Sequence, residues 1–219
     1  MTSDLQDRIV LVTGASGRLG RVVVSALART GARVVAIDRQ PYDGDAPVEL
    51  VVTADVTSEG DVASAFARVI DELGTPWGVI HTVGTWDGGP LAQTSLEGWR
   101  HVLDLNLTSA FLCVRETART MPEGRVIGIA SRQGADRAPA QQAAYAASKA
   151  GLVRLIEAAS AEHEALACVA IAPSMILFGE EPEGTAGVTA EAIADLCVRL
   201  CGDAGAVHDG TVLRAYGDA

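Results

Sequence analysis

Short apolar runs alternate with amphipathic segments along the whole chain. Each run is rich in Val, Ile and Ala and ends close to a Gly, Asp or Ser, which is typical of buried strands. These runs predict strands at 8–14, 32–38, 48–55, 77–84, 124–131, 165–174 and 209–217. Apolar residues at helical spacing predict helices at 17–31, 58–74, 94–121, 143–163 and 189–202. The third helix begins at a capping box formed by Thr94 and Glu97.

Repeated strand–helix units indicate a parallel sheet with helices on both faces. Strands that are apolar on both sides belong in the middle layer of such a protein. We therefore expect an α/β fold, a doubly wound three-layer α/β/α sandwich with a seven-stranded parallel sheet. The 219 residues contain no linker or repeat, so a single domain over 1–219 is predicted, with a short lid at about 174–188.

The first predicted strand runs directly into TGASGRLG, residues 13–20. Glycines permit positive φ and a close approach of the backbone to a phosphate, and the following helix offers its N-terminal N–H groups. Asp38 ends the second strand, where it would accept hydrogen bonds from a ribose and repel a 2′-phosphate. This favours NAD(H). NADP(H) stays open, because Arg18 or Arg39 could reach a 2′-phosphate or remain a surface charge.

The single lysine of the chain, Lys149, follows Tyr145 by four residues in AAYAASKAG. Residues at i and i+4 share a helix face, and a nearby cation favours the phenolate and lowers the pKa of a tyrosine. Such a phenol suits the protonation of an alkoxide. Ser131 ends the fifth predicted strand and could hold the substrate oxygen. The alternative is a surface aromatic beside a solvated charge.

TGASGRLG, Asn106 in DLNLTSAF, Ser131 in GIASRQG and YAASK occur in this order along essentially the whole chain. In this combination the sequence resembles the short-chain dehydrogenase/reductase family. The resemblance implies a Rossmann-type fold and NAD(P)-dependent interconversion of a carbonyl and an alcohol by hydride transfer. The implied catalytic set is Asn106, Ser131, Tyr145 and Lys149. Asn106 would support a proton-relay water; its alternative is a satisfied core amide.

The nucleotide site is assigned to residues of the glycine turn, of strand ends and of the catalytic helix. They are Gly14, Ser16, Gly17, Arg18, Leu19, Gly20, Asp38, Arg39, Asp55, Val56, Gly84, Tyr145, Lys149 and Pro173. Asp55 and Val56 resemble the adenine-contacting pair of the family. Trp86, Met175 and Phe178 are assigned to an apolar substrate pocket, with core or surface packing as the alternative.

Several positions depart from the family pattern. Arg18 stands where the turn usually has Gly, and His81 in HTVG replaces a residue that helps to tie the sheet together. Pro173 is followed by Ser174, without the usual Thr that contacts the nicotinamide. The short lid, TVGTWDGG and the YG ending resemble quinoid dihydropteridine reductase and its bacterial relatives. Two alternatives follow: a reductase of a C=N bond in a pteridine or imine, and a non-catalytic nucleotide-binding sensor or scaffold.

Composition limits the partners. The net charge of −11 argues against nucleic acid or an anionic membrane. We expect a cytoplasmic protein with a small carbonyl or alcohol substrate, because the sequence has no basic, apolar leader and no long apolar span. The family usually forms homodimers or homotetramers through the helices that carry Asn106 and Tyr145. The four cysteines lack metal-ligand spacing and are predicted as small buried thiols, with no metal site. Glu180, Glu181 and Glu183 are predicted as a solvated face of the lid.

Overall fold

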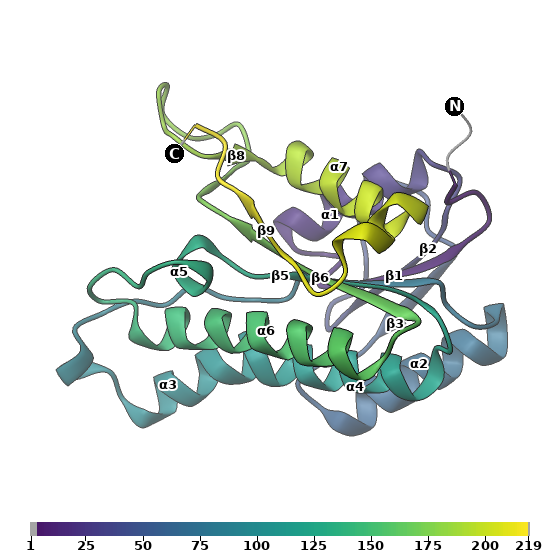
Figure 1. Cartoon of the computed structure of the whole chain (residues 1–219), viewed down its shortest axis with the longest axis horizontal. Helices are drawn as coiled ribbons and strands as arrows, with labels where there is room; N and C mark the ends of the chain where they lie inside the picture. Colours follow the sequence, from purple (N-terminus) through teal and green to yellow (C-terminus); the bar gives the residue numbers. More distant parts are fainter. Residues whose placement is uncertain (1–3, 219) are drawn as a thin grey trace.

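A parallel sheet forms the middle layer of the computed structural model, which describes residues 4–218 (Figure 1). Its strands are β1 (Ile9–Thr13), β2 (Arg33–Asp38), β3 (Leu50–Thr53), β4 (Gly78–His81), β5 (Gly124–Ile129), β6 (Leu166–Pro173) and β9 (Val212–Ala215). Their order is β3-β2-β1-β4-β5-β6-β9, and every neighbouring pair is parallel. The predicted seven-stranded Rossmann-type sheet is confirmed. The ends of the predicted domain, 1–3 and 219, lie outside the described residues.

Helices cover both faces of the sheet, as predicted (Figure 1). One face carries α1 (Arg18–Ala28) and α7 (Ala190–Cys201). The other carries α2 (Glu59–Leu73), α4 (Ser109–Thr120) and α6 (Ala143–Glu162). Within residues 4–218, no helix has both the length and the apolar character needed to cross a membrane.

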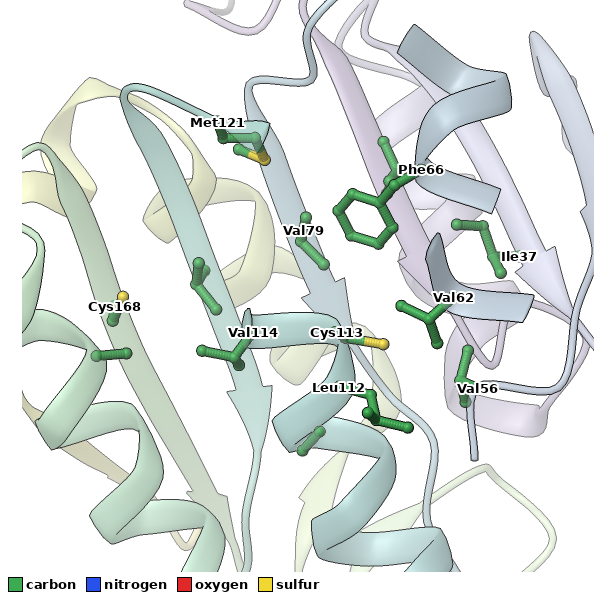
Figure 2. Close-up of a cluster of buried hydrophobic side chains, with 14 of the residues drawn as sticks. Ile37, Val56, Val62, Phe66, Val79, Leu112, Cys113, Val114, Met121 and Cys168 are labelled. Atoms are coloured by element: carbon green, nitrogen blue, oxygen red, sulfur yellow. The ribbon is translucent and has the colours of Figure 1, made fainter. Parts of the chain in front are cut away.

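Alternate residues of each central strand enter opposite layers of the core. In β1, Leu11 joins the cluster beneath α2, α4 and α6, whereas Val10 and Val12 join the cluster beneath α1 and α7. Figure 2 shows part of the first cluster, where Phe66 lies between α2 and the sheet. Because both faces are buried, the strands need unbroken apolar runs rather than alternation.

The four cysteines belong to these apolar layers. All are free and buried, as predicted, and burial raises the pKa of each thiol well above its ordinary value. Cys197 and Cys201 lie together on α7 without further ligands. Among the described residues, no group of three or more His, Cys, Asp or Glu side chains could hold a metal ion.

The single helix predicted over 94–121 is divided in the structure. A 3-10 turn, η1 (Leu91–Gln93), precedes α3 (Leu96–Leu103), a π-helical segment η2 (Asp104–Thr108) and then α4. Thr94 is not the cap, because its hydroxyl donates to the carbonyl of Pro90 at 3.3 Å within the preceding turn. The Ser95 hydroxyl caps α3 instead, accepting from the Gly98 N–H at 3.0 Å. The wider π turn carries Asn106, which is fully buried.

The predicted lid is closed at its base by two short strands that the sequence did not indicate. β7 (Ile176–Leu177) pairs in parallel with β8 (Val188–Thr189). At the tip, the Glu181 carboxylate accepts hydrogen bonds from the N–H groups of Phe178 and Gly179, each at 3.0 Å. The backbone hydrogen bonds lower the pKa of Glu181, so this residue braces the loop in addition to facing solvent.

His81, at the end of β4, is a buried histidine that links three elements. Its Nδ1 lies 2.8 Å from the Thr13 hydroxyl of β1, and its Nε2 lies 3.1 Å from the Ser109 hydroxyl of α4. The Ser109 hydroxyl donates to the Leu105 carbonyl at 2.7 Å. It therefore accepts from Nε2–H, and Nδ1 accepts from Thr13. Burial, with a smaller contribution from the charge of Lys149, lowers the pKa of His81 from 6.5 to about 3. A neutral imidazole at position 81 thus links β4 to β1 and to α4, at a position where the family usually has another residue.

We predict that His81 makes folding sensitive to moderate acid. Below pH 6.5 the imidazole of His81 binds a proton in the unfolded chain, whereas in the folded protein it stays neutral down to about pH 3. The contribution of His81 to the free energy of unfolding is therefore complete above pH 6.5 and is lost as the pH falls from 6.5 to about 3. Between about pH 7 and about pH 5, wild type should lose roughly 2 kcal/mol more free energy of unfolding than His81→Asn.

Urea unfolding at the two pH values measures this difference. His101→Gln is the control, because it removes an exposed histidine. An equal loss in wild type and His81→Asn would contradict a buried neutral imidazole.

Candidate active site

The turn after β1 forms a narrow backbone cradle at the start of α1. Gly14 has a φ of 73°, and a Cβ there would lie 2.8 Å from the Thr82 hydroxyl. A Cβ on Gly20 would lie 2.0 Å from the carbonyl oxygen of Gly14. Gly17 caps α1 without a side-chain hydrogen bond, so the first N–H groups of the helix are left to an outside acceptor. The cradle fits the pyrophosphate of a dinucleotide.

A cleft of about 460 Å³ extends from this cradle across the ends of β2 and β3. Eight of the predicted nucleotide residues line it: Gly14, Ser16, Gly17, Asp38, Arg39, Asp55, Val56 and Gly84. Further lining residues were not predicted: Gln40, Ala54, Thr82, Val83, Thr85, His101 and Leu105. The sequence offers no pattern for these, because the paths of the loops and the placement of the helical residues His101 and Leu105 bring them to the cleft.

Two carboxylates in the cleft are held by backbone N–H groups. Asp38 accepts from the N–H of Ser16 at 3.0 Å and from the N–H of Gln40 at 3.1 Å. Asp55 accepts from the N–H of Thr57 at 2.9 Å and from its hydroxyl at 2.7 Å, and these bonds lower the pKa of Asp55. Asp38 is therefore a fixed negative charge between the glycine turn and the end of β2.

A second cavity, of about 720 Å³, lies beside the cleft. Nine predicted residues line it: Arg18, Leu19, Gly84, Trp86, Tyr145, Lys149, Pro173, Met175 and Phe178. Thr82, Gly84 and Thr85 line both spaces, so the cleft and the cavity adjoin at these residues. Of the remaining predicted residues, Gly20, Asn106 and Ser131 do not line either space.

Lys149 presents a buried ammonium at the junction. It is 5% exposed, and its Nζ donates to the Ile129 carbonyl at 2.7 Å. Burial lowers the pKa of Lys149 to about 8. A Cβ on Gly84 would lie 3.0 Å from Nζ and 2.9 Å from the Asn106 Oδ1, so only glycine leaves both groups their room.

Tyr145 lines the cavity, and Ser131 is buried next to it, outside the lining. Burial raises the pKa of Tyr145, and a hydrogen bond with Ser131 opposes that shift. The expected lowering by Lys149 is not seen, because the ammonium is directed at Ile129 and burial of the phenol dominates. Ser131 also caps α5 (Arg132–Ala135), accepting from the Gly134 N–H at 3.2 Å.

Asn106 joins the π segment to its surroundings. Its Oδ1 accepts from the Thr85 N–H at 2.7 Å, and its Nδ2 donates to the Thr85 carbonyl at 2.9 Å and to the Ser148 hydroxyl at 3.0 Å. These bonds make it a satisfied core amide, the alternative weighed from the sequence. They use both amide protons, and its relay role stays a prediction.

Arg18 is turned toward the lid. Its guanidinium pairs with Glu180 at 2.8 Å and lies 4.0 Å above the ring of Phe178. Arg18 lines the 720 Å³ cavity and not the 460 Å³ cleft, whereas Arg39 lines the cleft. Of the two arginines, Arg39 is the one positioned near Asp38.

The chain is similar to known dehydrogenases and reductases. A family model described as short chain dehydrogenase matches residues 8–180. The 2,5-dichloro-2,5-cyclohexadiene-1,4-diol dehydrogenase of Sphingobium indicum is 30% identical over 172 residues, which cover 74% of this chain and 68% of that protein. A chloroplastic NADPH-dependent aldehyde reductase-like protein of Arabidopsis thaliana is 29% identical, with 97% and 94% covered.

Solved structures agree with the sequence relatives. The crystal structure of a putative short-chain dehydrogenase/reductase from Burkholderia xenovorans superimposes with a TM-score of 0.88 at 25% identity, covering 98% of this chain and 97% of that chain. Members of the matched family are oxidoreductases that bind NAD or NADP. On the family match and these relatives, the chain belongs to the short-chain dehydrogenase/reductase family.

Proposed function

We propose that the protein interconverts a carbonyl and an alcohol with NAD(H) or NADP(H). The observation that supports this most strongly is that the glycine-turn cleft adjoins a cavity lined by Tyr145 and Lys149. A nucleotide bound along the cleft would direct its nicotinamide toward that cavity. The nicotinamide would take up or supply the hydride at the carbon that bears the oxygen.

The protein side chains handle the proton and the oxygen. In alcohol oxidation the hydroxyl proton passes to the Tyr145 oxygen, and in reduction Tyr145 returns it. Ser131, hydrogen-bonded to Tyr145, orients the reacting oxygen and stabilises its developing charge. Lys149 adds a buried positive charge, and its Nζ would donate to a ribose hydroxyl of the bound nucleotide. If this contact brings Nζ closer to Tyr145, the positive charge would favour the Tyr145 phenolate.

NAD(H) is the favoured cofactor. The fixed carboxylate of Asp38 would accept from ribose hydroxyls and repel a 2′-phosphate. Arg39 lines the same cleft, and one relative is named NADPH-dependent, so the preference is open to direct measurement. The single-domain organisation and the lid at about 174–188 belong to the same proposal. So does assembly as a homodimer or homotetramer through the helical segments that carry Asn106 and Tyr145, which are η2 with its flanking helices and α6.

Removing the Tyr145 hydroxyl tests the mechanism. Tyr145→Phe should lower kcat/KM for any accepted alcohol or carbonyl by about 10²-fold or more, because the proton has no other positioned acceptor. Nucleotide affinity, measured by NADH and NADPH fluorescence, should stay within about twofold of wild type, since the ring remains in place.

Tyr216→Phe is the matched control, because its hydroxyl bonds Asp136 away from the cavity. Undiminished turnover by Tyr145→Phe would refute the mechanism. Nucleotide binding by wild type without turnover of any carbonyl or alcohol would support the non-catalytic alternative.

Asp38→Ala tests the cofactor preference. Wild type should bind NADH at least about tenfold more tightly than NADPH, because the 2′-phosphate would lie against a fixed carboxylate. Asp38→Ala should lose that ratio, although it also weakens the glycine turn by removing the bond to the Ser16 N–H. Asp45→Ala, an exposed carboxylate in the following loop, is the control. Tighter NADPH binding by wild type would overturn the preference.

A further inference from the structure

Two glutamine amides interrupt an otherwise largely apolar cavity wall. Gln133 and Gln142 line the cavity with Tyr145, and neither side chain has a hydrogen-bond partner within residues 4–218. The Oε1 of Gln142 is buried and unpartnered. Burying a polar atom without a hydrogen bond is unfavourable, and such atoms are uncommon in folded proteins. This oxygen has almost no accessible surface, so a ligand in the cavity becomes its missing partner when the amide turns toward the cavity.

Both amides lie close in sequence to the groups proposed to hold the reacting oxygen. Gln142 is at the N-cap position of α6, without a side-chain capping bond, and precedes Tyr145 by three residues, a spacing that brings side chains to the same helix face. Gln133 lies in α5, two residues after Ser131. The preceding residue, Gln141, adopts a φ of 64°, and its carbonyl accepts from the Gly89 N–H at 2.7 Å, which fixes the approach to α6.

The charges of the cavity are already engaged. Arg18 is paired with Glu180, and Lys149 donates to the Ile129 carbonyl. Each of these two cations therefore already has an oxygen partner, and neither is an unpaired charge that calls for an anionic substrate. Neutral amides match a neutral donor and acceptor, such as a hydroxyl group.

We propose that Gln142, supported by Gln133, selects neutral substrates that carry a second hydroxyl group next to the reacting carbon, as in a vicinal diol or a hydroxy ketone. This inference rests on the proposed function. The second hydroxyl donates to the Gln142 Oε1 and draws the amide toward the cavity, which satisfies the buried acceptor. The apolar wall, including Leu19 and Ile176, contacts the hydrocarbon part of the substrate.

The test compares cis-1,2-cyclohexanediol with cyclohexanol, which differ by one hydroxyl. Their affinities for protein saturated with NAD+ or, in parallel, NADP+ are measured by ligand-observed NMR, which needs no turnover. Where turnover occurs, the ratio of kcat/KM for the two alcohols is measured as well. Gln142→Met keeps the length of the side chain and removes both hydrogen-bonding atoms. Gln141→Met is the control, because Gln141 is exposed and does not line the cavity.

Wild type should prefer the diol by about tenfold, and Gln142→Met should lose most of that preference, while Gln141→Met keeps it. Gln142→Glu, which retains an acceptor, should restore part of it. Equal affinity of wild type for the two alcohols, binding of neither, or an unchanged ratio in Gln142→Met would overturn the inference. The proposed function fails on a different result, full turnover by Tyr145→Phe, so the two failures are distinguishable.

Discussion

The burial of one ammonium group constrains the arrangement of the whole site. Lys149 is held by the Ile129 carbonyl at the end of β5, and two glycines make room for it. A Cβ on Gly84 would crowd Nζ, and a Cβ on Gly134 would lie 2.5 Å from the Lys149 carbonyl carbon. Burial disfavours the charge, as the lowered pKa shows, so the fold keeps a positive group there against its own stability. That energetic cost is understandable where a nucleotide ribose supplies further acceptors.

The same junction explains the irregular backbone nearby. The π segment around Asn106 lets its amide bond both the N–H and the carbonyl of Thr85, which fixes the loop after β4. His81 holds the same end of β4 through its hydrogen bonds with Thr13 of β1 and Ser109 of α4. These polar ties hold the loop between nucleotide cleft and cavity in one position. A rigid loop there would suit the proposed hydride transfer, which requires close, defined placement of both reactants.

Most of the fold could be predicted, because apolar strands, helical spacing and glycine stops are local signals. The π segment could not, since the apolar spacing of DLNLTSAF is compatible with a continuous α-helix. The pairing of Tyr145 with Lys149 could be predicted, because residues four positions apart share a helix face. The direction of Arg18 toward Glu180 depends on where the lid folds, 162 positions away in sequence. The pKa of Tyr145 also could not be predicted from the sequence, because it is raised by burial in the folded protein and is not lowered by Lys149, its neighbour in the helix.

The most direct test of this account replaces Lys149 by Arg, which keeps the net charge but changes the shape of the cation. Nucleotide affinity and kcat are measured together, with thermal unfolding to verify the fold and Lys149→Met as an uncharged variant that fits the same space. Arg154→Lys, on the exposed side of α6, is the control. We predict at least about a tenfold loss in nucleotide affinity or kcat for Lys149→Arg, because a planar guanidinium does not fit between Gly84 and the Ile129 carbonyl. Affinity and kcat both within about twofold of wild type would contradict the central place given to this buried ammonium.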